Sequence, residues 1–246
     1  MNVPKTKAEE LQERVADLCE SPSPDPFTLR RLKAEAEKLK PKDPPMAFYL
    51  MGLLASVEYN PDGVRENFNK ALQFPLSSEG EFVCRGNYIT ALGRMGHGQE
   101  ALEFCRQSLD KFPTQKDFIK QFIAIHMQLG RLQTAAKRAK EEKLEYASLI
   151  LCAEFLAQEG VTDEETQQMV APELAILREK RIFIHEQTVG LFSDEDSTWV
   201  SYDIRVKKSI KEVVDMEVEL AEAVAKLDIP PRVLSLFNVS FSVWEE

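Results

Sequence analysis

The sequence has few of the residues that build metal sites and nucleophile sites. It holds four cysteines and three histidines, at Cys19, Cys84, Cys105, Cys152, His97, His126 and His185. The cysteines form no Cys-x-x-Cys pair and the histidines are isolated, whereas a zinc site needs such ligands at short, regular spacings. We therefore expect no metal and no cofactor, and we expect the cysteines to fill space in the core.

Positively charged residues are in the minority. The 31 Lys and Arg residues stand against 41 Asp and Glu residues, so the formal net charge is −10 at pH 7. Nucleic-acid binding needs a concentration of Lys and Arg to neutralise phosphates, which excludes nucleic acid as the principal ligand. An acidic protein instead suits a basic protein partner, because opposite charges steer the two molecules together.

Long apolar runs are missing as well. No stretch approaches the roughly 20 apolar residues that a membrane-spanning helix needs. The opening residues, Met1–Lys5, do not resemble a secretory signal. We expect no membrane partner and a cytoplasmic protein.

Two helix–turn–helix patterns follow one another at residues 82–113 and 116–144. Gly96 and Gly130 are 34 residues apart, and a small residue, Ala101 or Ala135, follows each glycine five positions later. Glycine permits a left-handed backbone at a tight turn, and a small side chain lets two helices approach closely. Pro113 ends the first pattern, because proline cannot continue a helix.

This period and this placing of glycine, alanine and proline resemble the tetratricopeptide repeat. A third copy is degenerate: residues 47–54 are similar to a first helix of the family, with Gly52 at its helix-packing glycine, and Phe68 and Pro75 fall near the second helix and its exit. The resemblance covers about residues 45–144. It implies a solenoid of helical hairpins and says little about the ligand.

Helices are expected on both sides of these repeats. Thr6 with Glu9 forms a capping box, and Asp25 is suited to cap a second helix, so the two helices would cover the start of the solenoid. After residue 144, we expect a helix over 146–158 followed by a second helix, and the two would form a degenerate final repeat. Pro172 is expected to kink or divide the second helix.

The hydrophobic period changes at about residue 181. Val200, Tyr202, Ile204 and Val206 alternate with polar residues, as in a half-buried strand. Alternation is weaker before residue 193. A helix is expected over 210–227 and a last alternating run over 239–243, so the predicted order is strand, strand, helix, strand.

We therefore predict a mainly α protein with two domains. Residues 1–180 form the tetratricopeptide-like solenoid with its N-terminal helical cap, and residues 181–246 form a small α+β module. The helix of the module would cross between parallel strands. Its core is thin, so the module would pack on the solenoid or form a dimer with a second copy.

No motif predicts catalysis. The glycine-rich residues 93–98 precede a helix and lack the Lys-Ser/Thr of a phosphate loop, so they are interpreted as a turn. The acidic residues 194–196 lack the glycine and the distal glutamate of a calcium loop. His185 stands beside Glu186 with no paired nucleophile. We predict that the protein is not an enzyme.

The resemblance implies a concave groove that holds a peptide or a helix. Carried over to this sequence, Asn87 and Gln121 would face the groove on neighbouring repeats, with Tyr88, Phe122 and His126 close by. Members of the family that clamp a C-terminal carboxylate use several Lys, Asn and Arg residues, of which only Asn87 matches here. We expect an adaptor for a protein or peptide partner, but not for that particular ligand.

A second hypothesis stays open at this point. The protein could be a dedicated inhibitor, of the immunity type, that binds and neutralises a basic enzyme. The acidic net charge and the C-terminal module, which lies outside the repeat pattern, are compatible with this function. Binding by an inhibitor of a basic enzyme would weaken steeply as salt rises, whereas adaptor binding would depend on salt only mildly.

Overall fold

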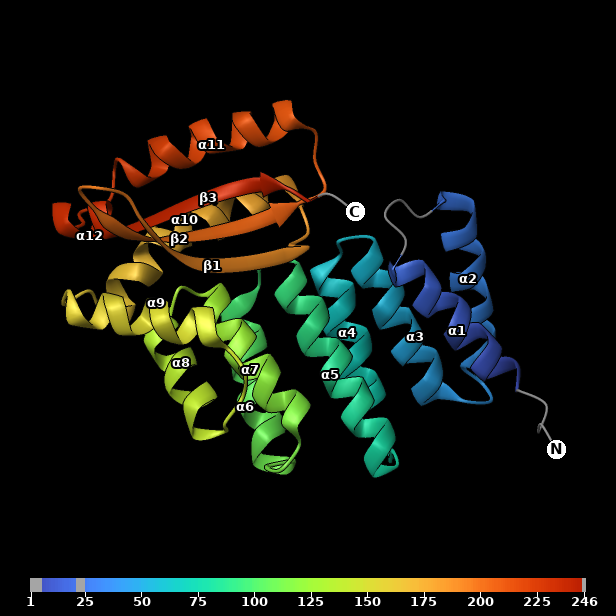
Figure 1. Ribbon diagram of the computed structural model, residues 1–246. Helices are drawn as coiled ribbons and strands as arrows, with labels where there is room; N and C mark the ends of the chain where they lie inside the picture. Colours follow the sequence, from blue (N-terminus) through green and yellow to red (C-terminus); the bar gives the residue numbers. More distant parts are fainter. Residues whose placement is uncertain (1–5, 21–24, 245–246) are drawn as a thin grey trace. The chain divides into compact units, whose positions relative to one another are not determined.

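The computed structural model describes residues 6–20 and 25–244, in which twelve helices and three strands follow one another (Figure 1). The predicted class, mainly α with a C-terminal α+β module, is confirmed. In chain order the elements are α1 (Lys7–Glu20), α2 (Pro26–Leu39), α3 (Pro44–Val57), α4 (Pro61–Leu72), α5 (Ser78–Arg94), α6 (Gly98–Lys111), α7 (Lys116–Gln128), α8 (Leu132–Glu141), α9 (Ala147–Gln158), α10 (Asp163–Lys180), β1 (Glu186–Ser193), β2 (Thr198–Val206), α11 (Ile210–Val224), α12 (Pro231–Leu236) and β3 (Phe237–Val243).

The chain forms two compact units, Met1–Leu92 and Gly93–Glu246. The division between them falls near the end of α5. The second unit therefore contains helices α6–α10 together with the whole C-terminal module. The predicted domain boundary between residues 180 and 181 stays a prediction.

Helix starts in the first unit follow the predicted caps. The Thr6 amide donates to a Glu9 carboxylate oxygen at 2.7 Å, and the Glu9 amide donates to the Thr6 hydroxyl at 3.2 Å. The Asp25 side chain accepts from the amides of Phe27 and Thr28 at the start of α2. These bonds satisfy amides that have no partner within the helix, which fixes where each helix begins.

A close approach of α3 and α4 forms the core of the first unit. A Cβ atom at Gly52 would lie 2.8 Å from the ring of Phe68, so only glycine fits at this crossing. The Phe68 ring stacks on Tyr88 of α5, with centroids 5.2 Å apart, and meets the ring of Tyr49 edge-on at 6.0 Å. Three helices are thus joined through one buried aromatic ring.

Glycine turns end helices in the second unit. Gly96 and Gly130 have φ angles of +74° and +73°, which confirms the left-handed turns expected from their spacing. At Gly130 the turn is also crowded, because a Cβ there would lie 2.7 Å from the carbonyl oxygen of Thr166. The Thr166 hydroxyl in turn donates to the Gly130 carbonyl at 2.6 Å. The turn after α7 is therefore pressed directly against α10.

The expected break at Pro172 does not divide the helix. Residues Asp163–Lys180 form one continuous helix, which opens with a capping box of Thr162 and Glu165. Proline removes one backbone hydrogen bond. The buried residues on either side of it, which include Val170 and Leu174, hold the helix in place through packing.

The sheet has the order β1-β2-β3, antiparallel between the first pair and parallel between the second. Tyr202 at its centre faces Val189 on β1 and Val239 on β3. The four alternating residues of β2 are fully buried, as their pattern predicted. The connection to β3 contains α11, as predicted, and the short helix α12, which was not.

Within the second unit, the C-terminal module packs on helices α7, α9 and α10. The Tyr202 hydroxyl donates to the carbonyl of Gln128 at 3.3 Å, and the Gln187 amide donates to the carbonyl of Ala124 at 2.7 Å. The Arg178 guanidinium reaches the carbonyl of Gly96 at 2.9 Å. The sheet therefore packs against the C-terminal end of α7, and α10 packs against the turn at Gly96.

One carboxyl group is completely buried between α10, the sheet and α11. Glu173 is 0% exposed, and neither of its carboxylate oxygens has a hydrogen-bond partner of normal geometry within the described residues. Burial raises its pKa well above the ordinary value, and the carboxylates of Asp203 and Glu217 raise it further, against a smaller lowering by the Ile204 amide. The fold therefore favours Glu173 in its neutral, protonated form.

Replacing Gly130 by valine should destabilise the protein by about 1–3 kcal/mol through the strained backbone, with a further loss from the contact with Thr166. Gly160→Val is a matched control. Its φ is also positive, at +69°, but a Cβ there meets only an Arg232 nitrogen at 4.0 Å. Denaturant unfolding should show the larger loss for Gly130→Val. Equal losses would show that the contact with α10 contributes nothing.

Replacing Glu173 by glutamine should change how stability depends on pH. Because folding raises the pKa of Glu173, its contribution to stability is full below about pH 4.3 and is lost as pH rises toward the folded-state pKa. Glutamine does not ionise, so the stability of Glu173→Gln relative to wild type should rise by about 1.4 kcal/mol per pH unit in that window. Urea unfolding at several pH values measures the slope. A flat difference between Glu173→Gln and wild type would contradict the buried-acid interpretation.

Candidate peptide-binding pocket

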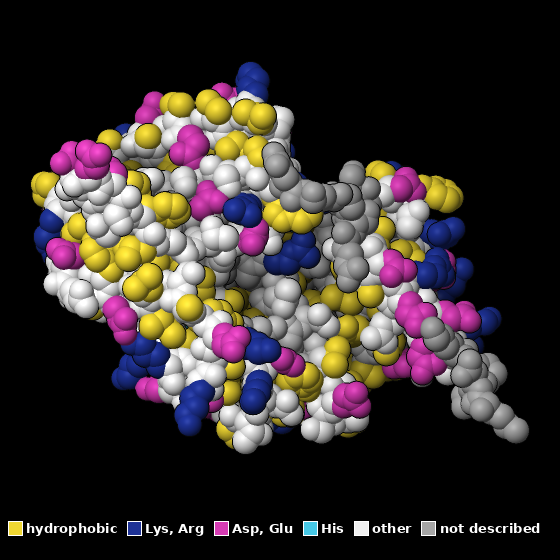
Figure 2. Space-filling view, in the orientation of Figure 1, with side chains coloured by type: hydrophobic (Ala, Val, Ile, Leu, Met, Phe, Trp, Pro, Cys, Tyr) yellow, Lys and Arg dark blue, Asp and Glu magenta, His cyan; other side chains and the backbone are white. Residues whose placement is uncertain are grey.

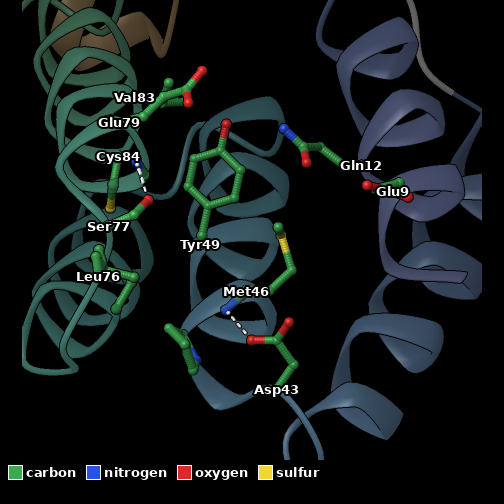
Figure 3. Close-up of a pocket in the computed structure, with 13 residues that line it drawn as sticks. Glu9, Gln12, Asp43, Met46, Tyr49, Leu76, Ser77, Glu79, Val83 and Cys84 are labelled. Carbon is green, nitrogen blue, oxygen red and sulfur yellow. Dashed lines mark hydrogen bonds between the residues drawn. The ribbon is translucent and has the colours of Figure 1, made fainter. Parts of the chain in front are cut away.

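A pocket of about 510 Å³ opens in the first unit, between α1, α3 and the chain that leads into α5 (Figure 3). Apolar side chains and small residues line its inner part, and acidic residues lie among the rest. The lining residues are Glu9, Gln12, Asp43, Pro45, Met46, Tyr49, Ala71, Leu76, Ser77, Glu79, Gly80, Val83 and Cys84. Most of them come from α1, α3 and α5, with Ala71 from α4 and with Asp43, Leu76 and Ser77 from the turns that lead into α3 and α5.

Helix α1 supplies one wall. Glu9 and Gln12 are three residues apart and therefore share one face of the helix. Figure 3 shows Gln12 reaching from α1 toward Tyr49 on α3. Glu9 is held in place by the capping bonds with Thr6. The cap that starts α1 thus also fixes a carboxylate at the pocket.

Helix α3 supplies the centre of the pocket. Asp43 caps the helix, since its side chain accepts from the Met46 amide at 3.2 Å, and this bond places the carboxylate at the pocket edge. Tyr49 lies one turn beyond Met46 and is only 9% exposed. Its hydroxyl accepts a hydrogen bond of 2.8 Å from the side-chain amide of Asn87. Tyr49 is therefore a fixed rather than an adaptable wall.

The first turns of α5 complete the pocket. The Ser77 hydroxyl accepts from the Gly80 amide at 3.0 Å, which turns the chain into the helix. Glu79 and Val83 are four residues apart on one face of α5, and Val83 is 36% exposed. Cys84 lies deeper and is buried. An apolar surface here sits next to a carboxylate.

The titratable groups at the pocket bottom are held in their protonated forms. Burial raises the pKa of the Cys84 thiol to about 12. Arg85 lowers this pKa and Glu81 raises it, and both effects are smaller than that of burial. Burial likewise raises the pKa of the Tyr49 hydroxyl to about 12, although the bond from Asn87 lowers it. A protonated thiol is a poor nucleophile, so the arrangement suits binding better than covalent chemistry.

The charge at the pocket is of one sign. Glu9, Asp43 and Glu79 line it, and among the lining residues that the structure describes there is no lysine or arginine. Each of these carboxylates stands at the beginning of a helix, where it also interacts favourably with the helix dipole. The pocket therefore combines an apolar interior with a negative edge.

Two of the residues predicted from the sequence lie behind this pocket. Asn87 is half-buried and supports Tyr49 through the hydrogen bond described above. Tyr88 is 4% exposed, because its ring stacks on Phe68 in the core. Both residues are thus placed to shape the pocket wall, and neither lines the pocket itself.

The other three predicted residues lie on α7 in the second unit. Gln121 and Phe122 are half-buried, and the Phe122 ring lies 4.4 Å from the imidazole of His126. His126 is only 2% exposed, and neither ring nitrogen has a hydrogen-bond partner in the described part of the chain. Burial, with smaller contributions from Arg131 and Arg106, lowers its pKa to about 4. The imidazole is therefore neutral at physiological pH and is part of the core.

Sequence reasoning did not single out the carboxylates of the pocket. In the sequence Glu9 is half of a capping box, and no motif points to Asp43 or Glu79. A usable signal is present, because each of the three stands at or near the start of a helix. In the structure the starts of α1, α3 and α5 line one pocket, so these residues come together.

The chain matches no model of a known protein family, no curated protein and no solved structure. The resemblance to tetratricopeptide repeats therefore stays a prediction. Over residues 6–20 and 25–244, no three Cys, His, Asp or Glu side chains are grouped so that they could hold a metal ion. In the same residues, no helix has both the length and the apolar character needed to cross a membrane.

The bond between Tyr49 and Asn87 can be tested with a double-mutant cycle. Tyr49→Phe and Asn87→Ala should each lower the free energy of unfolding by about 1 kcal/mol, because each leaves a half-buried polar group without its partner. The double variant should cost clearly less than the sum, since the two residues share one interaction. Additive losses in urea unfolding would show that the two side chains act independently.

Proposed function

We propose that the protein is a non-enzymatic interaction module that binds a basic peptide segment of a protein partner in the pocket of the first unit. The observation that carries this proposal is the pocket itself, whose described lining combines apolar side chains with three carboxylates and no cation. Its volume of about 510 Å³ lies within the range of about 300–1,000 Å³ that is usual for ligand pockets.

The chemistry of the lining favours a lysine or arginine side chain as the anchor. Such side chains combine an apolar stem with a charged end. The stem would lie against Met46, Leu76 and Val83, and the charged end would be attracted by Glu79 and its neighbours. Hydrogen bonds between a cation and a carboxylate are stronger than those between neutral groups.

A peptide that ends in a free carboxylate at the pocket would be repelled by the same residues. This supports the expectation that the ligand is not a C-terminal carboxylate of the kind clamped by some tetratricopeptide proteins. The partner itself is defined here only by its chemistry, which is an exposed basic segment with neighbouring apolar residues.

The proposal is tested with a library of N-acetylated and C-amidated peptides, randomised at each position and bound to the purified full chain. We expect enrichment of peptides with Lys or Arg next to apolar residues. For a selected peptide, Glu79→Lys should weaken binding roughly tenfold or more, because it places a cation in the pocket. Fluorescence titration at low and high salt measures the affinity.

Glu10→Lys is the matched control. Like Glu79, Glu10 is an exposed carboxylate in the first turn of a helix, but it does not line the pocket. Its replacement should leave affinity nearly unchanged. Equal loss in both variants, or a library without basic enrichment, would contradict the proposal. A very steep salt dependence would instead favour the inhibitor hypothesis.

A further inference from the structure

Two neutral polar groups of the pocket have hydrogen-bonding capacity that the described chain does not use. Gln12 lines the pocket from α1, and its side-chain amide has no hydrogen bond with any residue that the structure describes. Tyr49 lines the pocket from α3, and its hydroxyl accepts from Asn87 at 2.8 Å but donates to no described residue. In Figure 3 the Gln12 side chain points from α1 toward Tyr49. Both groups are therefore turned toward whatever occupies the pocket.

The hydroxyl proton of Tyr49 is held where little water reaches it. The residue is only 9% exposed, and burial raises the pKa of its hydroxyl to about 12, although the bond from Asn87 lowers this pKa. The proton therefore stays on the oxygen at physiological pH. A buried donor without an acceptor costs free energy, which an acceptor on a bound molecule would recover. Tyr49 thus favours an occupant that brings an acceptor to the centre of the pocket.

The charge around the pocket decides which acceptor fits. Glu9, Asp43 and Glu79 line the same space. On the face shown in Figure 2, Asp and Glu side chains also gather over α1, at the right of the view. These carboxylates repel an anionic acceptor such as a carboxylate or a phosphate. The acceptor that suits Tyr49 is therefore an uncharged oxygen, and in a peptide the most abundant one is the main-chain carbonyl, since every residue carries one.

The carboxylates themselves are suited to a different part of the peptide. Glu79 has neither a hydrogen bond nor an ion pair with any described residue, and Asp43 uses one carboxylate oxygen for the Met46 amide. Ionised carboxylates only accept, so they match the N–H groups of lysine or arginine and offer nothing to a carbonyl oxygen. A side-chain amide such as that of Gln12 both donates and accepts, as a main-chain peptide unit does.

We propose that Gln12 and Tyr49 bind the main chain of the partner's segment, beside the basic side chain that the carboxylates bind. The Tyr49 hydroxyl donates to one main-chain carbonyl, and the Gln12 amide pairs with a neighbouring peptide unit. This inference rests on the proposed function and sharpens it, because the pocket then recognises a peptide bond next to the basic residue and not the basic side chain alone.

The inference is tested with ester analogues of a basic peptide selected from the N-acetylated and C-amidated library. In each analogue one main-chain N–H is replaced by an ester oxygen, which removes a donor and weakens the carbonyl of the same unit as an acceptor. All side chains are kept. Fluorescence titration of the full chain should show roughly tenfold weaker binding for one or two positions beside the basic residue, and little change at the other positions.

Two variants assign the sensitive positions to their protein partners. Gln12→Met removes the amide and keeps an unbranched side chain, whereas Tyr49→Phe removes only the hydroxyl. Each variant should weaken binding of the parent peptide. Each should also reduce the loss caused by the ester at the position that its residue contacts, because the same bond cannot be lost twice. Circular dichroism checks that each variant is folded.

Gln73→Met is the matched control. Gln73 is an exposed glutamine of the first unit, directly after α4, and it does not line the pocket. Its replacement should change neither the affinity for the parent peptide nor the losses caused by the esters.

The results separate this inference from the proposed function. Basic peptides that bind but show no sensitive ester position would overturn the inference and leave the proposed function standing. The same holds for ester losses that are as large in Gln12→Met and Tyr49→Phe as in the wild type. A library without basic enrichment would contradict the proposed function and the inference together.

Discussion

The structure depends on the close approach of helices at positions where only glycine fits. At Gly52 the ring of Phe68 occupies the space that a side chain would need, and at Gly130 the backbone of α10 does so. Each crossing brings large apolar residues of neighbouring helices into one core. In the first unit this core holds Tyr49 in place, and Tyr49 in turn forms the centre of the pocket. Backbone freedom at a few glycines therefore determines the geometry of the proposed site.

The charge of the pocket follows from the way its helices begin. Carboxylates are favourable at helix starts because they accept bonds from free amides and interact with the helix dipole. In an isolated helix this effect is local. Here the starts of three hairpins face one pocket, so Glu9, Asp43 and Glu79 act together on whatever enters it. Residues that stabilise individual helices thereby acquire a shared role in selecting a ligand, with no additional residue required.

Local signals predicted much of the fold. The caps at Thr6 and Asp25 marked the first helix starts, glycine spacing marked the turns, and alternation marked β2. Tertiary packing decided the outcome at Pro172, where the helix is not divided. The site was harder to predict, because a pocket depends on which side chains from distant segments meet. Asn87 as a residue that faces a groove stays a prediction, and its bond to Tyr49 and the meeting of three carboxylates are properties of the assembled helices.

The topology of the module explains why the outer face of α11 is open. Parallel strands such as β2 and β3 need a crossover connection, and a helix in that connection packs one face on the sheet. The opposite face then points outward whatever residues it carries. A polar outer face would satisfy the fold equally well and would favour the helix more strongly. The folding of the chain alone therefore does not require the three branched apolar residues of this face, Ile210, Val214 and Val218.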